Sequence, residues 1–339
     1  MASYKNIHGF TIQNLDEDPS TTSSVGQIYY NASTGQFKSV IEGGASIGSW
    51  SSGGALNTRR SGLSAFGASN SSSIASGGSS PSETYEDVVE QYNGTSWTEI
   101  AEFTTGRNQH GGFGSATAGL IAGGVVALNT QTDSTQTWNG SSWAEANELN
   151  TSRGYMQTGG NGTSTAGLIS AGYTTTAVYN VESWDGSSWS EVAEPNSSVY
   201  LRASMGLAPN TDSLIFGGGY PRTTNTESWN GSSWTEVSDL NTARADMGGA
   251  GTATTGIGFG GRSNSPPPGT VLTEHWNGTS WTEIADQSVA TIFYFGDGGS
   301  ATSGMKIGGA TVDPPNNDLS NVVEEWAAAE IQIKTLTTS

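Results

Sequence analysis

The chain has no cysteine, few charged residues and no long apolar run, and each absence excludes a class of protein. Without cysteine there are no disulfides, no thiolate metal ligands and no thiol nucleophile. Asp, Glu, Lys and Arg make up 13% of the residues, against about 25% in typical soluble domains. No stretch of about 18 apolar residues is present, and the first residues lack the apolar segment of a secretory signal. We therefore expect neither membrane insertion nor conventional secretion.

Basic residues and histidines are also scarce. The chain has 12 Lys and Arg against 31 Asp and Glu, a formal net charge of −19, which opposes binding to nucleic acid. The three histidines, His8, His110 and His275, are far apart in the sequence, and the acidic residues 16–18 lack the spacing of a calcium-binding loop. The sequence thus predicts no metal site, no cofactor and no catalytic residue, and we expect the protein not to be an enzyme.

Glycine is abundant, with 48 residues, and a pair of aromatic residues recurs along the chain. A four-residue turn such as NGSS or NGTS separates the members of each pair, which are Tyr92–Trp97, Trp138–Trp143, Trp184–Trp189, Trp229–Trp234 and Trp276–Trp281. With Trp50 added, the second members recur every 45 to 47 residues, and a period of roughly 40–50 residues is typical of β-propeller blades. The Asn-Gly step predicts a hairpin that places the two aromatics of a pair opposite each other.

Every repeat has further landmarks in the same order. A glutamate stands two residues after the second aromatic, and the next segment carries an arginine at Arg60, Arg107, Arg153, Arg202 or Arg244. A Gly-rich stretch and a short apolar run ending in a Gly pair follow. We expect four strands per unit: the first after the arginine, the second ending at the Gly pair, the third ending at the first aromatic and the fourth beginning at the second.

The Gly pair, the Glu-x-Trp before the turn and the second Trp resemble kelch repeats, which build β-propellers. The resemblance covers residues 46 to about 330 and implies an all-β fold, a six-bladed kelch-like β-propeller at 46–330 with a leader at 1–45 and a tail at 331–339. No second Trp follows Trp326 in the sixth unit. We expect residues 46–52 to supply the missing outer strand by pairing with residues 321–326, which would close the ring.

The leader carries a hairpin pattern in which QIYY and QFKSV alternate around NASTG. Because an isolated hairpin is marginally stable, we expect it to dock on the propeller, on another copy or on another protein. Such a leader before kelch-like units, in an acidic chain without cysteine, resembles virion proteins of marine tailed bacteriophages. The resemblance implies a non-enzymatic tail fibre or capsid decoration in the virion, attached to other virion proteins through its leader. It also implies a homo-oligomer whose propeller contacts a subunit or a host-surface glycan or protein.

The repeated arginines have two interpretations. A sialidase-like propeller uses an arginine cluster to bind a carboxylate, so a soluble carbohydrate-binding or glycan-cleaving propeller is the alternative function. Recurrence in blade after blade favours structural ion pairing instead. We expect the partner to be the glutamate two residues after each second Trp, in a bridge between blades.

The loops that follow the Gly pairs differ in length and content from unit to unit. Antiparallel alternation places them at the same face as the connections that lead to each arginine. Variable loops on a rigid scaffold commonly carry binding residues, and drift of unconstrained loops is the alternative. The candidate binding residues are the aromatic and basic side chains of this variable stretch: Tyr85, Tyr173, Tyr179, Tyr220, Arg222 and Arg262.

Overall fold

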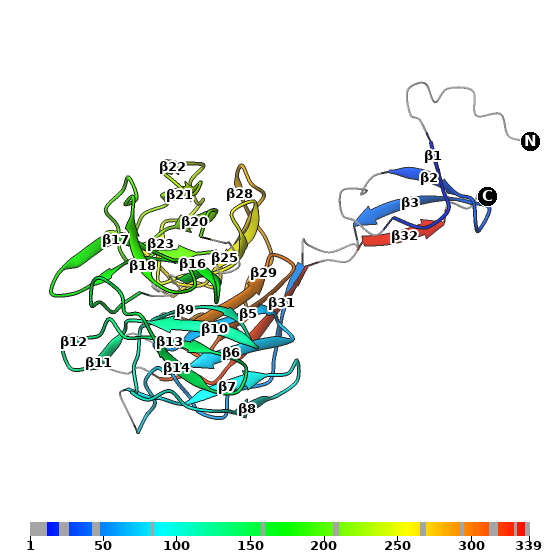
Figure 1. Ribbon diagram of the computed structural model, residues 1–339. Coiled ribbons are helices and arrows are strands. Elements are labelled where there is room, and N and C mark those ends of the chain that lie inside the picture. The colour runs from blue at the N-terminus through cyan, green and yellow to red at the C-terminus, as the bar shows by residue number, and fades with distance from the viewer. Residues whose placement is uncertain are drawn as a thin grey trace, which may run out of the picture. The chain divides into compact units, whose positions relative to one another are not determined.

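The computed structural model describes residues 12–19, 27–42, 48–82, 85–156, 160–205, 210–264, 269–291, 295–311, 318–328 and 331–335. Over these ranges the chain is all-β and contains no helix, so it has no helix that could span a membrane. The chain divides into two compact units. The smaller one comprises Met1–Gly48 and Ala328–Ser339, and the larger one comprises Ser49–Ala327 (Figure 1).

The larger unit is built from six four-stranded sheets, each confined to one repeat of the sequence except the last. The first three sheets are β5 (Ser64–Ser69), β6 (Ser72–Ser76), β7 (Val89–Tyr92) and β8 (Trp97–Glu99); β9 (Gly111–Ser115), β10 (Ala118–Ala122), β13 (Thr135–Trp138) and β14 (Trp143–Ala146); and β15 (Gly160–Thr163), β16 (Ala166–Tyr173), β17 (Ala177–Trp184) and β18 (Trp189–Val192).

The other three sheets follow the same order. They are β19 (Ala203–Ser204), β20 (Ser213–Phe216), β21 (Thr226–Trp229) and β22 (Trp234–Glu236); β24 (Gly248–Thr252), β25 (Thr255–Phe259), β27 (Thr273–Trp276) and β28 (Trp281–Glu283); and β29 (Gly296–Ser300), β30 (Ser303–Ile307), β31 (Val323–Ala328) and β4 (Gly48–Ser52). Two short ribbons, β11 (Val125–Ala127) with β12 (Thr130–Gln131) and β23 (Arg244–Ala245) with β26 (Arg262–Ser263), extend from the loops. The four-strand expectation for each repeat is confirmed.

The aromatic pairs lie directly opposite each other across the third and fourth strands, as the turn sequence predicts. Trp138 pairs in register with Trp143, and the ring centroids of the five pairs are 4.9 to 5.4 Å apart. The turn between them uses glycine at positive φ, for example Gly140 at 92°. The Asn139 side-chain oxygen accepts the backbone N–H groups of Ser141 and Ser142, each at 2.9 Å. A short side chain thus caps the turn while glycine supplies its backbone conformation.

The sixth sheet takes its outer strand from the other end of the repeat region. β4 pairs with β31, and the N–H of Gly53 donates to the carbonyl of Val323 at 2.9 Å. Trp50 lies 5.6 Å from Trp326, and its indole N–H donates to Thr273 Oγ1 at 2.9 Å. The expected pairing is confirmed for residues 48–52; residues 46 and 47 lie outside the described residues. The strand therefore completes the sixth sheet with the same aromatic pair as the other five.

Six apolar clusters fill the space between the sheets, and each joins two successive sheets. Phe113 and Leu120 of the second sheet pack with Ile169 and Trp184 of the third. Equivalent clusters join the other neighbours, and the last joins the sixth sheet to the first through Met305, Ile307, Val323, Leu63, Ala75 and Tyr92. Every sheet thus buries an apolar face against the sheets before and after it, and the series returns to its start.

Backbone hydrogen bonds from the Gly pairs repeat the same cyclic order. In the first, second, fourth and sixth units the second glycine donates its N–H to the carbonyl of the arginine in the next unit, for example from Gly78 to Arg107 at 2.9 Å and from Gly309 to Arg60 at 2.8 Å. Glycine is required because the chain turns at positive φ against this backbone. A Cβ on Gly308, which has φ +63°, would lie 2.8 Å from the Arg60 oxygen.

The smaller unit holds the predicted hairpin, but the hairpin is not isolated. β2 (Ile28–Asn31) and β3 (Gln36–Glu42) pair around the turn, β1 (Gln13–Leu15) adds in parallel to β2, and β32 (Ile331–Thr335) adds in antiparallel to β3. The leader and the tail therefore share one four-stranded sheet. This pairing has no local signal in the sequence, because the whole repeat region separates the five-residue strand β32 from its partner β3.

The acidic residues 16–18 form a charged turn, and the exposed Asp18 also holds side chains of this sheet. Asp18 accepts hydrogen bonds from the Tyr29 hydroxyl at 2.7 Å and from the Lys38 ammonium at 2.8 Å, and Asn31 donates to the same carboxylate at 2.5 Å. The Lys38 bond is the main reason that the pKa of Asp18 lies below its usual value. Burial, reinforced by the Asp18 contact, raises the pKa of Tyr29 to about 12. Asp18 therefore anchors the start of the leader to its hairpin.

Candidate functional site

The repeated arginines are buried against the sheets, and all except Arg107 bind a glutamate that stands two residues before the first aromatic of the pair. In the fifth sheet, Arg244 Nη2 donates to Glu274 Oε1 at 2.8 Å, and Nη1 donates to the carbonyls of Gly260 and Leu272 at 2.9 Å each. The other carboxylate oxygen accepts both the backbone N–H and the side-chain amide of Asn241 at 2.8 Å. One carboxylate thus fixes both the asparagine and the arginine of the LNTxR segment.

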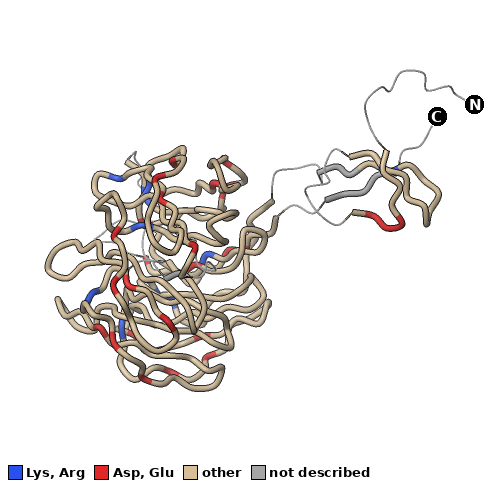
Figure 2. Tube along the Cα trace, turned by 45° about the horizontal axis from the view of Figure 1, so that its top comes forward, with Lys and Arg blue, Asp and Glu red and all other residues tan. Residues whose placement is uncertain are grey.

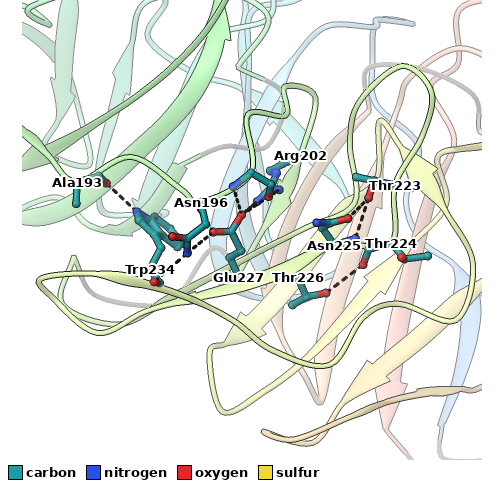
Figure 3. Close-up of polar contacts among 10 residues, drawn as sticks. Ala193, Asn196, Arg202, Thr223, Thr224, Asn225, Thr226, Glu227 and Trp234 are labelled. Atoms are coloured by element: carbon teal, nitrogen blue, oxygen red, sulfur yellow. Dashed lines mark hydrogen bonds and ion pairs between the residues drawn. The ribbon is translucent and has the colours of Figure 1, made fainter.

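We call this arrangement the Arg–Glu–Asn lock. It recurs in the first sheet as Arg60–Glu90–Asn57, in the third as Arg153–Glu182–Asn150 and in the fourth as Arg202–Glu227–Asn196 (Figure 3). The arginine and asparagine belong to the connection from the preceding sheet, and the glutamate lies on the third strand of the following sheet. The lock therefore fixes each connection to the sheet that it enters.

The expected partner glutamate was wrong. The residues two positions after the second aromatic, Glu99, Glu145, Glu191, Glu236 and Glu283, are exposed. Each stands across the hairpin from the inner position of the third strand, as Glu283 does opposite Glu274. Two directly opposed residues lie on the same face of a sheet, so the difference comes from the strand: Glu274 lies on the covered third strand, next to the arginine, whereas Glu283 lies on the outer edge strand. The ion pair also joins a connection to the sheet that the connection enters, and it does not bridge two sheets.

Two sheets depart from this pattern. In the sixth, Lys306 on β30 replaces the arginine and donates to Glu324 Oε2 at 2.5 Å, while the N–H of Ser288 donates to Oε1 at 2.8 Å. In the second, Gln136 stands at the glutamate position and donates to Glu145 Oε1 at 2.6 Å. Arg107 there bonds the carbonyls of Gly123 and Ser134, at 3.2 and 3.0 Å. Burial lowers the pKa of Arg107 to about 10.

The repeated arginines are therefore bound by groups of the protein itself and are buried. Arg60, Arg107, Arg153 and Arg244 are at most 1% exposed, and Arg202 is 5% exposed. Their guanidinium groups are distributed around successive sheets and directed into them, so they do not converge on a common surface point. A carboxylate-binding arginine cluster would need the opposite arrangement.

Among the candidate binding residues, Tyr220 and Arg222 lie together in the loop after the fourth Gly pair. Tyr220 is 76% exposed, and the Arg222 guanidinium carbon lies 5.6 Å from the centre of its ring. Arg222 Nη1 reaches the side-chain oxygen of Asn264, in the corresponding loop of the fifth unit, at 3.5 Å. The two loops therefore meet at this arginine.

Arg262 lies in the fifth-unit loop on β26 and binds a residue that sequence reasoning missed. Its Nε donates to Asp246 Oδ2 at 2.6 Å, and its Nη2 approaches the same oxygen at 2.5 Å. Asp246 is fully buried, and burial raises its pKa to about 6 against the opposing effects of Arg262 and Arg222. Asp246 stands two residues after the lock arginine Arg244. The residues around it form no motif that would indicate a buried carboxylate.

The three remaining candidates lie elsewhere. Tyr173 ends β16, is 36% exposed and packs edge-on against Tyr155 at 5.6 Å. Tyr179 is half-buried within β17, so it belongs to a strand and not to a loop. Tyr85 is half-buried, and its backbone lies close enough to Gly106 to exclude a Cβ there. The structure thus brings together Tyr220, Arg222 and Arg262 and does not bring Tyr85, Tyr173 or Tyr179 to them.

Four non-glycine residues with positive φ lie where the connections enter the first strands. They are Gln109, Tyr155, Leu201 and Asp246, with φ between 52° and 58°. Backbone hydrogen bonds link two of these residues to a residue with positive φ in the unit before. The N–H of Gln109 donates to the carbonyl of Gly62 at 2.6 Å, and the N–H of Asp246 donates to the carbonyl of Leu201 at 3.4 Å. A left-handed conformation is uncommon for residues with a Cβ and often accompanies function. A Gly at position 62 with φ +69° is the only sequence signal of this set.

A buried carboxylate without a lock partner lies on the first strand of the sixth sheet. Asp297 is 6% exposed, and its Oδ2 accepts the N–H of Gly249 at 2.5 Å. Burial raises its pKa well above the usual value. Lys306 stands opposite on β30, but its ammonium binds Glu324 and the carbonyl of Val289.

Replacement of Asp297 by Asn should stabilise the protein at neutral pH. A carboxyl whose pKa is raised by folding contributes stability below its unfolded pKa and loses that contribution as the pH rises through its folded pKa. Each unit of pKa difference corresponds to about 1.4 kcal/mol. Thermal unfolding should show a higher midpoint for Asp297→Asn at pH 8 and a vanishing difference near pH 4. The same substitution at the exposed Asp185, whose pKa is lowered to about 2 by hydrogen bonds in its turn, should give no gain at pH 8. A lower midpoint for Asp297→Asn at pH 8 would contradict this assignment.

Other site chemistry is sparse among the residues that the structure describes. They contain no group of three His, Asp or Glu side chains that could hold a metal ion. Figure 2 shows acidic residues spread over the larger unit and few basic ones. The paired loops at Tyr220, Arg222 and Arg262 are therefore the best candidate for a binding site. A scan against protein-family models and a search of curated proteins found no match to this chain.

Proposed function

We propose that the chain is a non-enzymatic virion structural protein whose repeat region is a six-bladed kelch-like β-propeller. The cyclic order of the apolar clusters and of the Gly-pair hydrogen bonds supports the propeller. The sequence resemblance to kelch repeats and to phage virion proteins supports the location, as a tail fibre or capsid decoration. In this proposal the smaller unit attaches to other virion proteins, and the loops after the Gly pairs contact a host surface or a neighbouring subunit.

The observation that carries the non-enzymatic assignment is the burial of the lock arginines. A sialidase-like propeller needs exposed arginines that converge on a substrate carboxylate. Here each arginine instead binds a pair of backbone carbonyls, a glutamate or both. Recurrence of the same contacts in successive sheets is what packing symmetry produces. The glycan-cleaving alternative therefore has no arginine cluster to use.

Attachment and recognition should separate when each unit is altered alone. A chain shortened to residues 49–327 loses the sheet of the smaller unit and should no longer be incorporated into particles. Replacement of residues 219–222 and 264–268 by Gly-Ser linkers of equal length should leave incorporation intact and weaken contact with the host. Particle incorporation is measured by mass spectrometry of purified particles, and host contact by adsorption to cells. Normal incorporation of the shortened chain, or loss of incorporation with unchanged adsorption for the loop variant, would contradict the assignment of the two roles.

A further inference from the structure

The fifth unit breaks the symmetry of the repeats at one position. Two residues after the repeated arginine stand uncharged residues in the first four units: Gly62, Gln109, Tyr155 and Ser204. The fifth unit has Asp246 there, fully buried and bound by the loop residue Arg262. Buried ion pairs contribute little net stability because desolvation offsets their attraction. A departure that is confined to one unit and adds little stability indicates a role other than packing.

A second cation, Arg222, lies near this pair and is positioned by contacts with uncharged side chains. The Arg222 guanidinium carbon lies over the Tyr220 ring, 5.6 Å from its centre, and the side chain is half-buried. Among the described residues, its Nη1 makes one long hydrogen bond, to Asn264 Oδ1 at 3.5 Å, and its Nε is buried without a hydrogen-bond partner. Asp246 attracts Arg222 electrostatically and accepts a hydrogen bond from Arg262 Nε. In the part of the chain that the structure describes, the guanidinium is thus positioned without an ion pair to a carboxylate.

We propose that Tyr220 and Arg222, positioned by Asn264 and the Arg262–Asp246 pair, bind a sugar that carries a carboxylate, such as a uronic or sialic acid. The guanidinium edge matches a carboxylate in a planar, two-bond geometry. The free face of Tyr220, 76% exposed, offers an aromatic surface against which the C–H face of a sugar ring packs. This inference rests on the proposed role of the loops in recognition.

The net charge restricts the ligand further. A chain with a net charge of −19 repels an extended polyanion. One uncompensated cation suits a single acidic sugar at the end of a glycan. Asp246, because it is bound to Arg262, does not add a free negative charge at the site.

The test measures binding to the full chain by ligand-observed NMR. The probes are methyl glucuronide with its uncharged methyl ester, and sialyllactose with lactose. At least one acidic member should bind at millimolar concentration, and its uncharged partner should bind at least 10-fold more weakly. Arg222→Gln and Tyr220→Ala should each lower the affinity at least 10-fold. Arg59→Gln, which removes an exposed cation elsewhere, should leave the affinity unchanged.

Three results would overturn the proposal: no binding of either acidic sugar, equal binding of the charged and uncharged partners, or equal losses in Arg59→Gln and Arg222→Gln. Thermal unfolding of each variant shows that a loss of binding is not a loss of fold, because both substituted side chains lie in a surface loop. Failure here remains distinguishable from failure of the proposed function. If the loop replacement weakens host adsorption while neither sugar binds, the loops recognise their partner through other chemistry.

Discussion

Glu274→Ala is expected to lower the stability of the larger unit by about 3–5 kcal/mol, the cost of leaving one partner of a buried ion pair uncompensated. The carboxylate accepts bonds from Arg244 and from both the backbone and the side chain of Asn241. Its removal leaves Arg244 charged at 0% exposure. The connection between the fourth and fifth sheets loses its attachment at the same time.

The matched control is Glu283→Ala on the neighbouring strand. Glu283 lies directly opposite Glu274 but is exposed, and a surface substitution of this kind changes stability by about 0.5 kcal/mol or less. Chemical denaturation of both variants gives the two free energies of unfolding. Equal losses would mean that the inner glutamate acts only as a strand residue and that the lock does not stabilise the fold.

The strand order within each repeat could be predicted from the sequence because local signals define it. Asn-Gly turns fix the hairpins, Gly pairs end the second strands, and the aromatic pairs fix the register. The missing second Trp of the sixth unit also predicted the pairing of β4 with β31. Because the repeat is otherwise regular, this absence indicated that the outer strand comes from elsewhere in the chain. These inferences needed only period and turn chemistry.

The partners of the buried charged residues could not be predicted from the sequence in the same way. Each repeat offers two glutamates at opposed positions of the hairpin, such as Glu90 and Glu99, and spacing alone does not say which of the two the arginine contacts. In the sixth sheet the cation is Lys306, which lies on the second strand and not in the connection before the first strand. No motif in the sequence therefore marks it. Asp246 and the pairing of β32 with β3 likewise depend on residues brought together from distant parts of the chain.

Residues 48–53 should matter more to the larger unit than everything before them. β4 covers the outer edge of β31, places Trp50 between Trp326 and Phe259 at 5.6 and 5.0 Å, and donates the indole N–H to Thr273. Loss of a packed Trp costs about 3–5 kcal/mol when it is fully buried, and the strand hydrogen bonds add to this. Without β4, the sixth sheet exposes an unpaired edge and loses part of its contact with the fifth.

The most direct measurement of ring closure is the thermal unfolding midpoint of two shortened chains, residues 46–328 and residues 54–328. Both lack the smaller unit, so the comparison isolates β4 and the residues next to it. Closure by β4 predicts that the chain of residues 46–328 keeps the midpoint of the larger unit in the full protein. The chain of residues 54–328 should then unfold at a midpoint lower by several degrees or fail to fold. Equal midpoints for the two chains would contradict closure by this strand.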